Sequence, residues 1–369
     1  MTDRLKIGFD AKRIVRNGTG LGSYGRTLVN DLASYPMELS LYAPDQGRDH
    51  LRQQIRQQEN VRFCYPAPSH LPFSKALWRS KGIVSDLKSD GIQVFHGLSG
   101  ELPVGIRKSG IKSVVTIHDL IFLRHPEFYH WIDTKIYAWK FRQTLREADH
   151  IIAICECTRR DIMEYGGDLI SEDRISLIYQ SCAPKFTVSQ SAAPRERYIL
   201  SVGSIEARKN ILLAVKALPY LPEELKLVIV GKHTPYTDEV IAYAEKAHLI
   251  HRIQLMHGVS DEALPRLYAE AEAFVYPSRY EGFGIPIIEA ISCGLPVVAC
   301  TGSCLEEAGG PDSLYVDPDD AQAMAHAIRQ VLRGAEGREK RIENSQQYIK
   351  RFAGNDVAGQ VVELYRSLL

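Results

Sequence analysis

The stretch that most constrains the fold runs from Tyr276 to Ala299 and reads Y-P-S-R-Y-E-G-F-G-I-P-I-I-E-A-I-S-C-G-L-P-V-V-A. Its first apolar residues end at Pro277, which predicts a buried strand that stops there. Gly282 and Gly284 predict a loop whose backbone can approach a ligand closely. Pro286 suits the first position of a helix, and a glycine ends that helix before a second apolar strand. The pattern therefore predicts free backbone N–H groups at a helix start, an arrangement that favours phosphate binding.

Two carboxylates flank this glycine loop. Glu281 lies just before it, and Glu289 lies near the start of the predicted helix. Because a carboxylate repels phosphate, both side chains are expected to face sugar or ribose hydroxyls, from which an ionised carboxylate accepts strong hydrogen bonds. Each residue alone also fits a structural role, Glu281 as a helix cap and Glu289 as an acid that the helix dipole favours. The glycine loop between them makes the functional interpretation preferable.

The segment E-G-F-G-I-P-I-I-E resembles the E-x7-E signature of the retaining GT-B glycosyltransferases, glycosyltransferase family 4. This family includes sucrose synthases and many bacterial mannosyl- and glucosyltransferases, and the resemblance covers nearly the whole chain. It implies an α/β fold of two Rossmann-like, doubly wound domains that face a central cleft. The alternation of predicted strands and helices in both halves independently indicates two such domains. The predicted boundaries are 1–185 for an acceptor-binding domain, 186–350 for a nucleotide-sugar-binding domain, and 351–369 for a helix that packs back on the first.

In the second half, two basic residues lie between a predicted strand at 198–202 and a predicted helix at 211–218. Arg208 and Lys209 match the family's donor-phosphate motif, although Ser204 replaces the first arginine of that motif. Two cations together with backbone N–H groups suit a diphosphate, whereas a solvated helix start is the default for such charges alone. By the resemblance, the donor-binding residues of this half are Gly203, Val259, Leu264, Gly282, Phe283, Gly284, Ile285, Pro286 and Glu289.

The first half carries a second glycine loop, R-N-G-T-G-L-G-S-Y-G-R, after a predicted strand at 5–10. Its spacing does not fit a dinucleotide fingerprint, and the resemblance assigns Gly20 and Gly22 to the donor phosphate; a merely flexible loop is the alternative. His118 follows a β-branched strand at 113–117, where a side chain at the carboxyl end points into the ligand crevice. The resemblance places this histidine against the donor sugar, and a satisfied buried histidine is the alternative.

The resemblance implies retaining transfer of a hexose from a nucleotide diphosphate sugar to a glycan or lipid-linked acceptor, with front-face attack. GDP-mannose is the preferred donor and UDP-sugars are the alternative, for a surface polysaccharide such as lipopolysaccharide. The proposed catalytic residues are His118 and Glu281 at the donor sugar and Arg208 and Lys209 at the leaving diphosphate. These cations remove the need for a metal, so neither a metal site nor a cofactor is expected.

Two other functions fit parts of the same pattern. A sugar-nucleotide epimerase shares the two-domain architecture, but it would need acid–base carboxylates and histidines around the sugar carbon, and the E-x7-E segment disfavours it. A non-catalytic subunit that binds nucleotide sugar is disfavoured because the candidate catalytic residues are all present.

Composition and charge limit the partners. Formal net charge is zero over 369 residues, so nothing indicates nucleic-acid binding. The seven cysteines include no C-x-x-C pair, which is typical of reduced cytosolic thiols. No signal peptide and no apolar run of about 18 residues is found, so a cytoplasmic protein is expected, either soluble or peripheral on the inner membrane face.

The basic residues are concentrated in the first half. Residues 1–185 carry 26 Lys and Arg against 21 Asp and Glu. Residues 48–88 hold eight of these basic residues, interleaved with Leu71, Pro72, Phe73, Leu77 and Trp78. Basic residues beside exposed aromatics suit an anionic membrane surface, and an ordinary solvated face with a core stripe is the alternative. The aromatic stretch at 125–149 either shapes an acceptor site or belongs to the core.

Overall fold

The computed structural model describes residues 4–68, 73–180, 182–183, 185–187, 197–260, 262–352 and 355–369. It forms two compact units: an N-terminal unit of Met1–Gln180 and Asp356–Leu369, and a C-terminal unit of Ser181–Asn355. The sequence placed these divisions at 185/186 and 350/351. Residues 184 and 188–196, next to the first predicted boundary, lie outside the described residues, as do Leu71 and Pro72.

The N-terminal unit is built on a seven-stranded parallel sheet in the order β3-β2-β1-β4-β5-β6-β7. Its strands are nearly continuous runs of buried residues, as expected for a parallel sheet covered on both faces. In the register of the central pair, Leu5 lies opposite Met37. The strands are β1 (Leu5–Asp10), β2 (Met37–Tyr42), β3 (Val61–Cys64), β4 (Val94–Gly97), β5 (Lys112–Ile117), β6 (His150–Ala153) and β7 (Ile175–Leu177).

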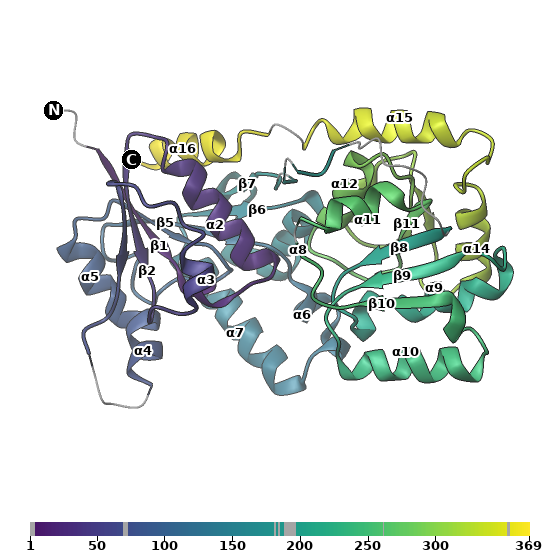
Figure 1. The fold of residues 1–369 in the computed structure, drawn as a ribbon. Helices are drawn as coiled ribbons and strands as arrows, with labels where there is room; N and C mark the ends of the chain where they lie inside the picture. Colours follow the sequence, from purple (N-terminus) through teal and green to yellow (C-terminus); the bar gives the residue numbers. More distant parts are fainter. Residues whose placement is uncertain are drawn as a thin grey trace. The chain divides into compact units, whose positions relative to one another are not determined.

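Helices cover both faces of this sheet (Figure 1). One core cluster joins α2 and the C-terminal helix α16 to β1, β2 and β4, and a second joins α5, α7 and α8 to the other face. Purple α2 and yellow α16 lie side by side although they come from opposite ends of the chain. The helices are α1 (Lys12–Arg16), α2 (Gly20–Leu32), α3 (Asp49–Arg52), α4 (Ser74–Leu77), a π-helical turn (Trp78–Gly82), α5 (Ile83–Ser89), α6 (Ile121–Arg124), α7 (Trp131–Glu147), α8 (Glu156–Gly166) and α16 (Val357–Leu368), with short 3-10 turns at Pro126–Phe128, Gly167–Leu169 and Glu172–Arg174.

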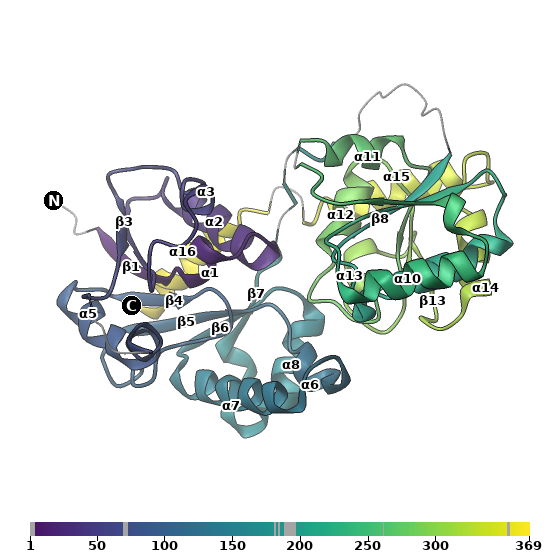
Figure 2. The same cartoon turned by 60° about the horizontal axis from the view of Figure 1, so that its bottom comes forward.

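The C-terminal unit repeats this architecture with a six-stranded parallel sheet in the order β10-β9-β8-β11-β12-β13. The strands are β8 (Tyr198–Val202), β9 (Lys226–Val230), β10 (Ile253–Met256), β11 (Ala273–Tyr276), β12 (Val297–Cys300) and β13 (Leu314–Val316). Helix α10 lies on one side of the sheet, and α11, α12 and α15 lie on the other (Figure 2). The helices are α9 (Ile211–Ala217), α10 (Pro235–Lys246), α11 (Leu264–Glu270), α12 (Ile285–Ser292), α13 (Leu305–Gly309), α14 (Ala321–Arg329) and α15 (Arg338–Ile349), with 3-10 turns at Ala207–Lys209, Leu218–Tyr220 and Ile250–Arg252.

In each sheet the strand order reverses at one point, between β1 and β4 in the N-terminal unit and between β8 and β11 in the C-terminal unit. Ligands of doubly wound folds bind outside the carboxyl ends of the strands at this topological switch point. The two units therefore each offer one such position, and both are described below.

The predicted N-terminal glycine loop is largely helical, which corrects the sequence interpretation. Gly20 is the first residue of α2 and Gly22 lies in its first turn, where the carbonyl of Thr19 accepts the N–H of Gly22 at 3.0 Å. A Cβ at Gly22 would lie 1.9 Å from the carbonyl oxygen of Asn17. The glycine is therefore required by the close approach of its own chain.

The aromatic stretch at 125–149 is also not ordinary core. Phe141 is buried, but Trp131 and Trp139 on α7 are 62% and 61% exposed. Large exposed apolar side chains grouped on one helix are typical of a surface that binds a partner or a ligand.

Candidate functional site

The carboxyl ends of β8 and β11 bring the predicted cations and the first predicted carboxylate together. Arg208 and Lys209 lie in the 3-10 turn after β8, and Glu281 lies in the loop after β11. The Lys209 Nζ atom is 2.6 Å from Glu281 Oε1, and the Arg208 Nη1 atom is 3.1 Å from Glu281 Oε2. Lys209 Nζ also donates to the Tyr276 hydroxyl at 2.8 Å. We call Arg208, Lys209 and Glu281 the donor cluster.

The donor cluster combines a buried carboxylate with two half-buried cations, and it is fully charged at neutral pH. Burial by itself would raise the pKa of Glu281, but the charges of Lys209 and Arg208 outweigh it and lower that pKa to about 2. Burial likewise disfavours the Lys209 ammonium, yet the Glu281 carboxylate raises the pKa of Lys209 above its usual value. The Ser278 hydroxyl donates a further hydrogen bond to Glu281 Oε1 at 2.6 Å.

These contacts differ from the expected role of Glu281. The sequence argument placed this carboxylate opposite sugar hydroxyls, whereas in the structure its oxygens contact the two cations. Two buried cations without a counter-charge would be strongly destabilising, so the nearest buried acid pairs with them. The arrangement holds both cationic side chains at the carboxyl ends of β8 and β11.

The glycine loop between β11 and α12 has the backbone geometry that its sequence predicts. Gly284 has φ +100°, and a Cβ there would lie 3.2 Å from Leu305 Cδ2. Phe283 is buried, with its ring centroid 5.2 Å from that of Phe352. Ile285 is the first residue of α12 and Pro286 the second, so the positive end of the helix dipole follows the loop directly.

Glu289 lies on α12 and is half-buried. Its Oε2 atom accepts a hydrogen bond from the Tyr268 hydroxyl at 2.9 Å. Burial, with the Glu289 charge as the second cause, raises the pKa of Tyr268 well above its usual value. The sequence analysis missed Tyr268, because its position in α11 looks like ordinary core.

The other predicted donor residues lie along the same edge of the sheet. Gly203 follows β8 with φ +150°, and a cavity of about 10 Å³, the volume of about one water, is lined in part by Gly203, Lys209 and Tyr276. Val259 follows β10, and Leu264 is the first residue of α11; both are half-buried.

His118 belongs to the N-terminal unit, where it follows β5. Its Nε2 atom donates to the Leu98 carbonyl at 2.9 Å, so Nδ1 is the acceptor, and the Gln180 side-chain amide donates to it at 2.9 Å. The Tyr24 ring packs edge-on against the imidazole at 4.8 Å between centroids. Burial lowers the pKa of His118 to about 4, so the ring is neutral at pH 7. Gln180 is the last residue of the first segment of this unit, and no sequence motif identified it as a partner of His118.

His96 is a structural residue of the N-terminal unit. It is fully buried in β4. Its Nδ1 atom lies 2.6 Å from the Tyr365 hydroxyl of α16, and its Nε2 atom lies 2.8 Å from Thr116 Oγ1 of β5. Burial lowers the pKa of His96 to about 3. The neutral ring therefore links the C-terminal helix to the sheet.

The described residues offer neither a metal-binding cluster nor a membrane-spanning helix. Within them, no three His, Cys, Asp or Glu side chains gather as a metal ion would require. No helix of the same ranges combines the length and apolar character needed to cross a membrane.

Two family models together match most of the chain. "Glycosyltransferase Family 4" matches residues 18–182, and "Glycosyl transferases group 1" matches residues 185–348. O-antigen chain mannosyltransferase B of Escherichia coli is 32% identical over 391 residues, which cover 99% of this chain and 100% of that protein. O-antigen chain mannosyltransferase RfbU of Salmonella typhimurium is 27% identical over 217 residues, 59% of this chain and 60% of that protein.

Solved structures agree on the fold. A sucrose-phosphate synthase from Thermosynechococcus elongatus superposes with a TM-score of 0.79 at 21% identity and covers 99% of both chains. Anabaena Alr3699/HepE in complex with UDP and glucose superposes with a TM-score of 0.75 at 17% identity, over 99% of this chain and 100% of that one. At these identities the likeness shows the GT-B fold and nothing more.

Proposed function

The chain belongs to glycosyltransferase family 4, and from that premise we propose that it transfers mannose from GDP-mannose to a glycan acceptor during surface polysaccharide synthesis. It is a hexosyltransferase of GT-B fold. The observation that carries the choice of mannose is the full-length similarity, 32% identity, to O-antigen chain mannosyltransferase B. That relationship also disfavours an epimerase or a non-catalytic subunit.

We propose that Arg208 and Lys209 stabilise the charge that develops on the leaving diphosphate. Both cations are fixed before the donor arrives, because Glu281 contacts each of them within 3.1 Å. Preorganised charges stabilise a transition state without reorganisation at the moment of reaction. Glu281 then acts mainly by positioning the two cations, and Glu289 with Tyr268 is the proposed contact for the ribose hydroxyls. Gly203, the loop from Gly282 to Pro286, Val259 and Leu264 complete the proposed donor site.

We assign His118 to the donor sugar. Its neutral imidazole keeps the Nε2 proton on the Leu98 carbonyl, and Nδ1 is the one acceptor that the ring can offer. In the described structure that acceptor is bonded to Gln180, so contact with a sugar hydroxyl through Nδ1 requires the Gln180 amide to be displaced or shared.

Transfer is proposed to be independent of metal, because the two cations supply the positive charge that a metal would otherwise contribute. The proposed site of action is the cytoplasmic face of the inner membrane, with peripheral contact. Arg79 does not belong to the membrane surface that the sequence suggested, because it is buried in ion pairs with Asp10 and Glu101. Phe73 and Leu77, 85% and 66% exposed, remain candidates together with Lys75.

The test is a thermal-shift panel of GDP, UDP and ADP with their sugar conjugates, with and without EDTA, followed by a transfer assay. A ligand that binds only the native state raises the melting temperature by mass action. We expect GDP and GDP-mannose each to raise the melting temperature by the same amount with and without EDTA. In the transfer assay, addition of an acceptor glycan should release GDP from GDP-mannose. A shift with UDP alone would replace the donor assignment, and no shift with any nucleotide would contradict the donor site.

A further inference from the structure

The N-terminal unit has a cavity of about 700 Å³ at its own topological switch point. Asp10 is the last residue of β1 and Lys12 the first of α1, and Phe95 and Glu101 come from β4 and the segment after it. The remaining wall comes from residues 73–80 and from α7. The predicted donor residues take no part in this lining, so the cavity is distinct from the site proposed above. We call it the switch-point pocket.

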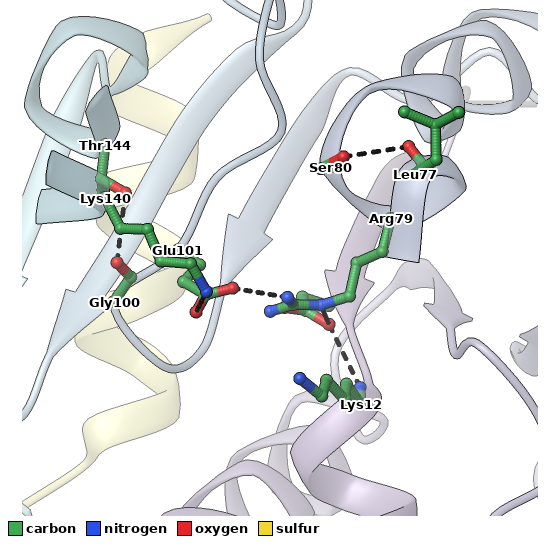
Figure 3. A network of polar contacts seen from close by, with 9 residues as sticks. Lys12, Leu77, Arg79, Ser80, Gly100, Glu101, Lys140 and Thr144 are labelled. Carbon is green, nitrogen blue, oxygen red and sulfur yellow. Dashed lines mark hydrogen bonds and ion pairs between the residues drawn. The ribbon is translucent and has the colours of Figure 1, made fainter. Parts of the chain in front are cut away.

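A network of paired charges, in which Asp10 is buried and the other members are half-buried, forms part of the wall of the switch-point pocket (Figure 3). Arg79 donates through Nε to Asp10 Oδ2 at 3.0 Å and is ion-paired with Glu101 at 2.5 Å. Lys140 of α7 lies 3.0 Å from the other oxygen of Glu101. The Thr144 hydroxyl donates to the Gly100 carbonyl at 3.1 Å, which fixes the Glu101 segment against α7. Both carboxylates of the pocket are therefore already paired with cations.

Lys12 is the cation that this network leaves over. Its backbone N–H donates to Asp10 Oδ1 at 3.1 Å, but no described residue forms a hydrogen bond or an ion pair with its ammonium group. The side chain is half-buried, and burial followed by the charge of Arg79 lowers its pKa. Five cations line the pocket: Lys12, Arg16, Lys75, Arg79 and Lys140. Arg79 and Lys140 share Asp10 and Glu101, and Arg16 and Lys75 both pair with Asp45. An anion beside Lys12 would complete the charge balance.

Part of the pocket lining is apolar and open to solvent. Phe73, Leu77 and Trp139 all line it, and they are 85%, 66% and 61% exposed. A group of large exposed side chains beside a cavity is typical of a binding surface. The pocket therefore combines an uncompensated ammonium with an apolar rim, which suits a ligand that carries an anionic group and a hydrocarbon chain.

We propose that the switch-point pocket binds the phosphate or diphosphate through which a lipid carries the acceptor glycan. Lys12 contacts the anionic group, and the first part of the hydrocarbon chain lies against Phe73, Leu77 and Trp139. This inference rests on the proposed glycosyl transfer, but the ligand chemistry follows from the pocket itself. A phospholipid headgroup offers the same phosphate, and the experiment separates these two sources.

Binding is measured by calorimetry on the full chain with four probes: dodecyl diphosphate, inorganic diphosphate, uncharged dodecyl maltoside and dihexanoyl phosphatidylglycerol. Dodecyl diphosphate is expected to bind the most tightly. Lys12→Gln should weaken it about tenfold, the equivalent of about 1.4 kcal/mol, while Lys88→Gln, on the exposed end of α5, should not. Equal binding by Lys12→Gln and the parent chain would overturn the proposal. Equally tight, Lys12-dependent binding of phosphatidylglycerol would make the pocket a membrane headgroup site instead.

The apolar rim has a matched pair of variants. Trp139→Ala should weaken dodecyl diphosphate but leave inorganic diphosphate unchanged. Trp131→Ala removes an equally exposed tryptophan of the same helix that does not line the pocket, so it should change neither. Equal effects of the two substitutions would exclude Trp139 as a contact for the hydrocarbon chain of the ligand.

A transfer assay separates this inference from the proposed function. The acceptors are a mannose-terminated disaccharide joined to dodecanol through diphosphate and the same disaccharide as an uncharged dodecyl glycoside. Lys12→Gln should raise KM for the diphosphate acceptor several-fold more than KM for the glycoside. An unchanged KM ratio with active enzyme would overturn the pocket assignment alone. No transfer to either acceptor by the parent chain, with Lys12-dependent binding intact, would overturn the proposed function alone.

Discussion

The two units share a topology, but their switch points differ in how charge is paired. After β8 and β11, both cations of the C-terminal unit contact one buried carboxylate, and the adjoining cavity is about 10 Å³. After β1 and β4, the N-terminal unit has a cavity of about 700 Å³ lined by Lys12, whose ammonium group forms no ion pair or hydrogen bond with a described residue. The same strand order therefore determines where a ligand binds, while the local pairing of charges determines which ligand fits.

The difference teaches that a closed, paired cluster and an open, unpaired one suit different tasks. The donor cluster is rigid and preorganised, as transition-state stabilisation requires. The switch-point pocket is roomy and amphiphilic, as recognition of a large acceptor requires. Each prediction below alters one side of this comparison and leaves the other in place.

The largest effect is expected from Lys209→Ala in the donor cluster. Removing one of the two cations should lower the rate of mannose transfer about a hundred- to a thousandfold, the usual cost of losing a preorganised charge. Glu281 keeps Arg208 as a partner, so the free energy of unfolding should fall by about 1–3 kcal/mol only. Transfer kinetics and urea unfolding measure the two quantities.

The control for that experiment is Glu306→Gln, an exposed residue of the same unit, which should change neither quantity. A folded Lys209→Ala protein with full activity would break the comparison, because the donor cluster would then be a structural ion pair only. Binding of dodecyl diphosphate should be equal in all three proteins.

Acid should affect the two units in different pH ranges. In the folded N-terminal unit the pKa values of His96 and His118 are lowered to about 3 and about 4. In the unfolded chain a histidine has its ordinary pKa of about 6.5, so below that pH the unfolded state binds more protons than the folded state. The stability of this unit is complete above pH 6.5 and falls as the pH is lowered toward 4. Glu281, with its pKa lowered to about 2, contributes stability that is complete above about pH 4.5 and is lost only below it.

Tryptophan fluorescence makes this difference measurable, because all three tryptophans lie in the N-terminal unit. The urea concentration at the midpoint of the fluorescence change should decrease as the pH is lowered from 6.5 to 4.5. GDP should still bind the C-terminal unit and raise its stability at pH 5. A fluorescence midpoint that stays constant over this range would contradict the burial of neutral histidines.

Tyr365→Phe tests how the C-terminal helix is held. The substitution leaves His96 Nδ1 without its 2.6 Å partner in a buried position, which should cost about 1–3 kcal/mol of unfolding free energy. Tryptophan fluorescence would report the loss, and GDP affinity should not change. Tyr220→Phe, which alters an exposed tyrosine of the other unit, is the matched control. A loss of GDP affinity in Tyr365→Phe would contradict the assignment of His96 as structural.

Much of this fold could be predicted from local patterns. Strand β8 has the bounds expected from its apolar run, and Gly284 adopts the positive φ that the loop before α12 needs. Periodicity and backbone restrictions act over a few residues, so one sequence suffices to read them. The helical start of α2 was missed because Gly22 is required by the close approach of the Asn17 carbonyl, a contact that the local sequence does not reveal.

The partners within the sites were harder to foresee, because they come from distant segments. The contact of Glu281 with Lys209 exists only because β8 and β11 are adjacent in the sheet. The same holds for Arg79 with Asp10 and Glu101. A charged residue in the sequence does not indicate whether another segment neutralises it, and that pairing is what distinguishes the two switch points.

The smallest expected effect concerns Gln180, which touches neither switch-point cluster. Its amide donates to His118 Nδ1 at 2.9 Å and so favours the neutral ring with the proton on Nε2. In Gln180→Glu a carboxylate accepts instead, which favours a proton on Nδ1 and raises the pKa of His118 from its lowered value. In the proposed function a neutral His118 accepts a hydrogen bond from a sugar hydroxyl, so the acid limb of the kcat profile should move to higher pH. The rate at pH 8 should fall only a few-fold, and Gln180→Met, which neither donates nor carries charge, should leave the limb in place. An unshifted limb in Gln180→Glu would mean that His118 does not act through Nδ1 in the reaction.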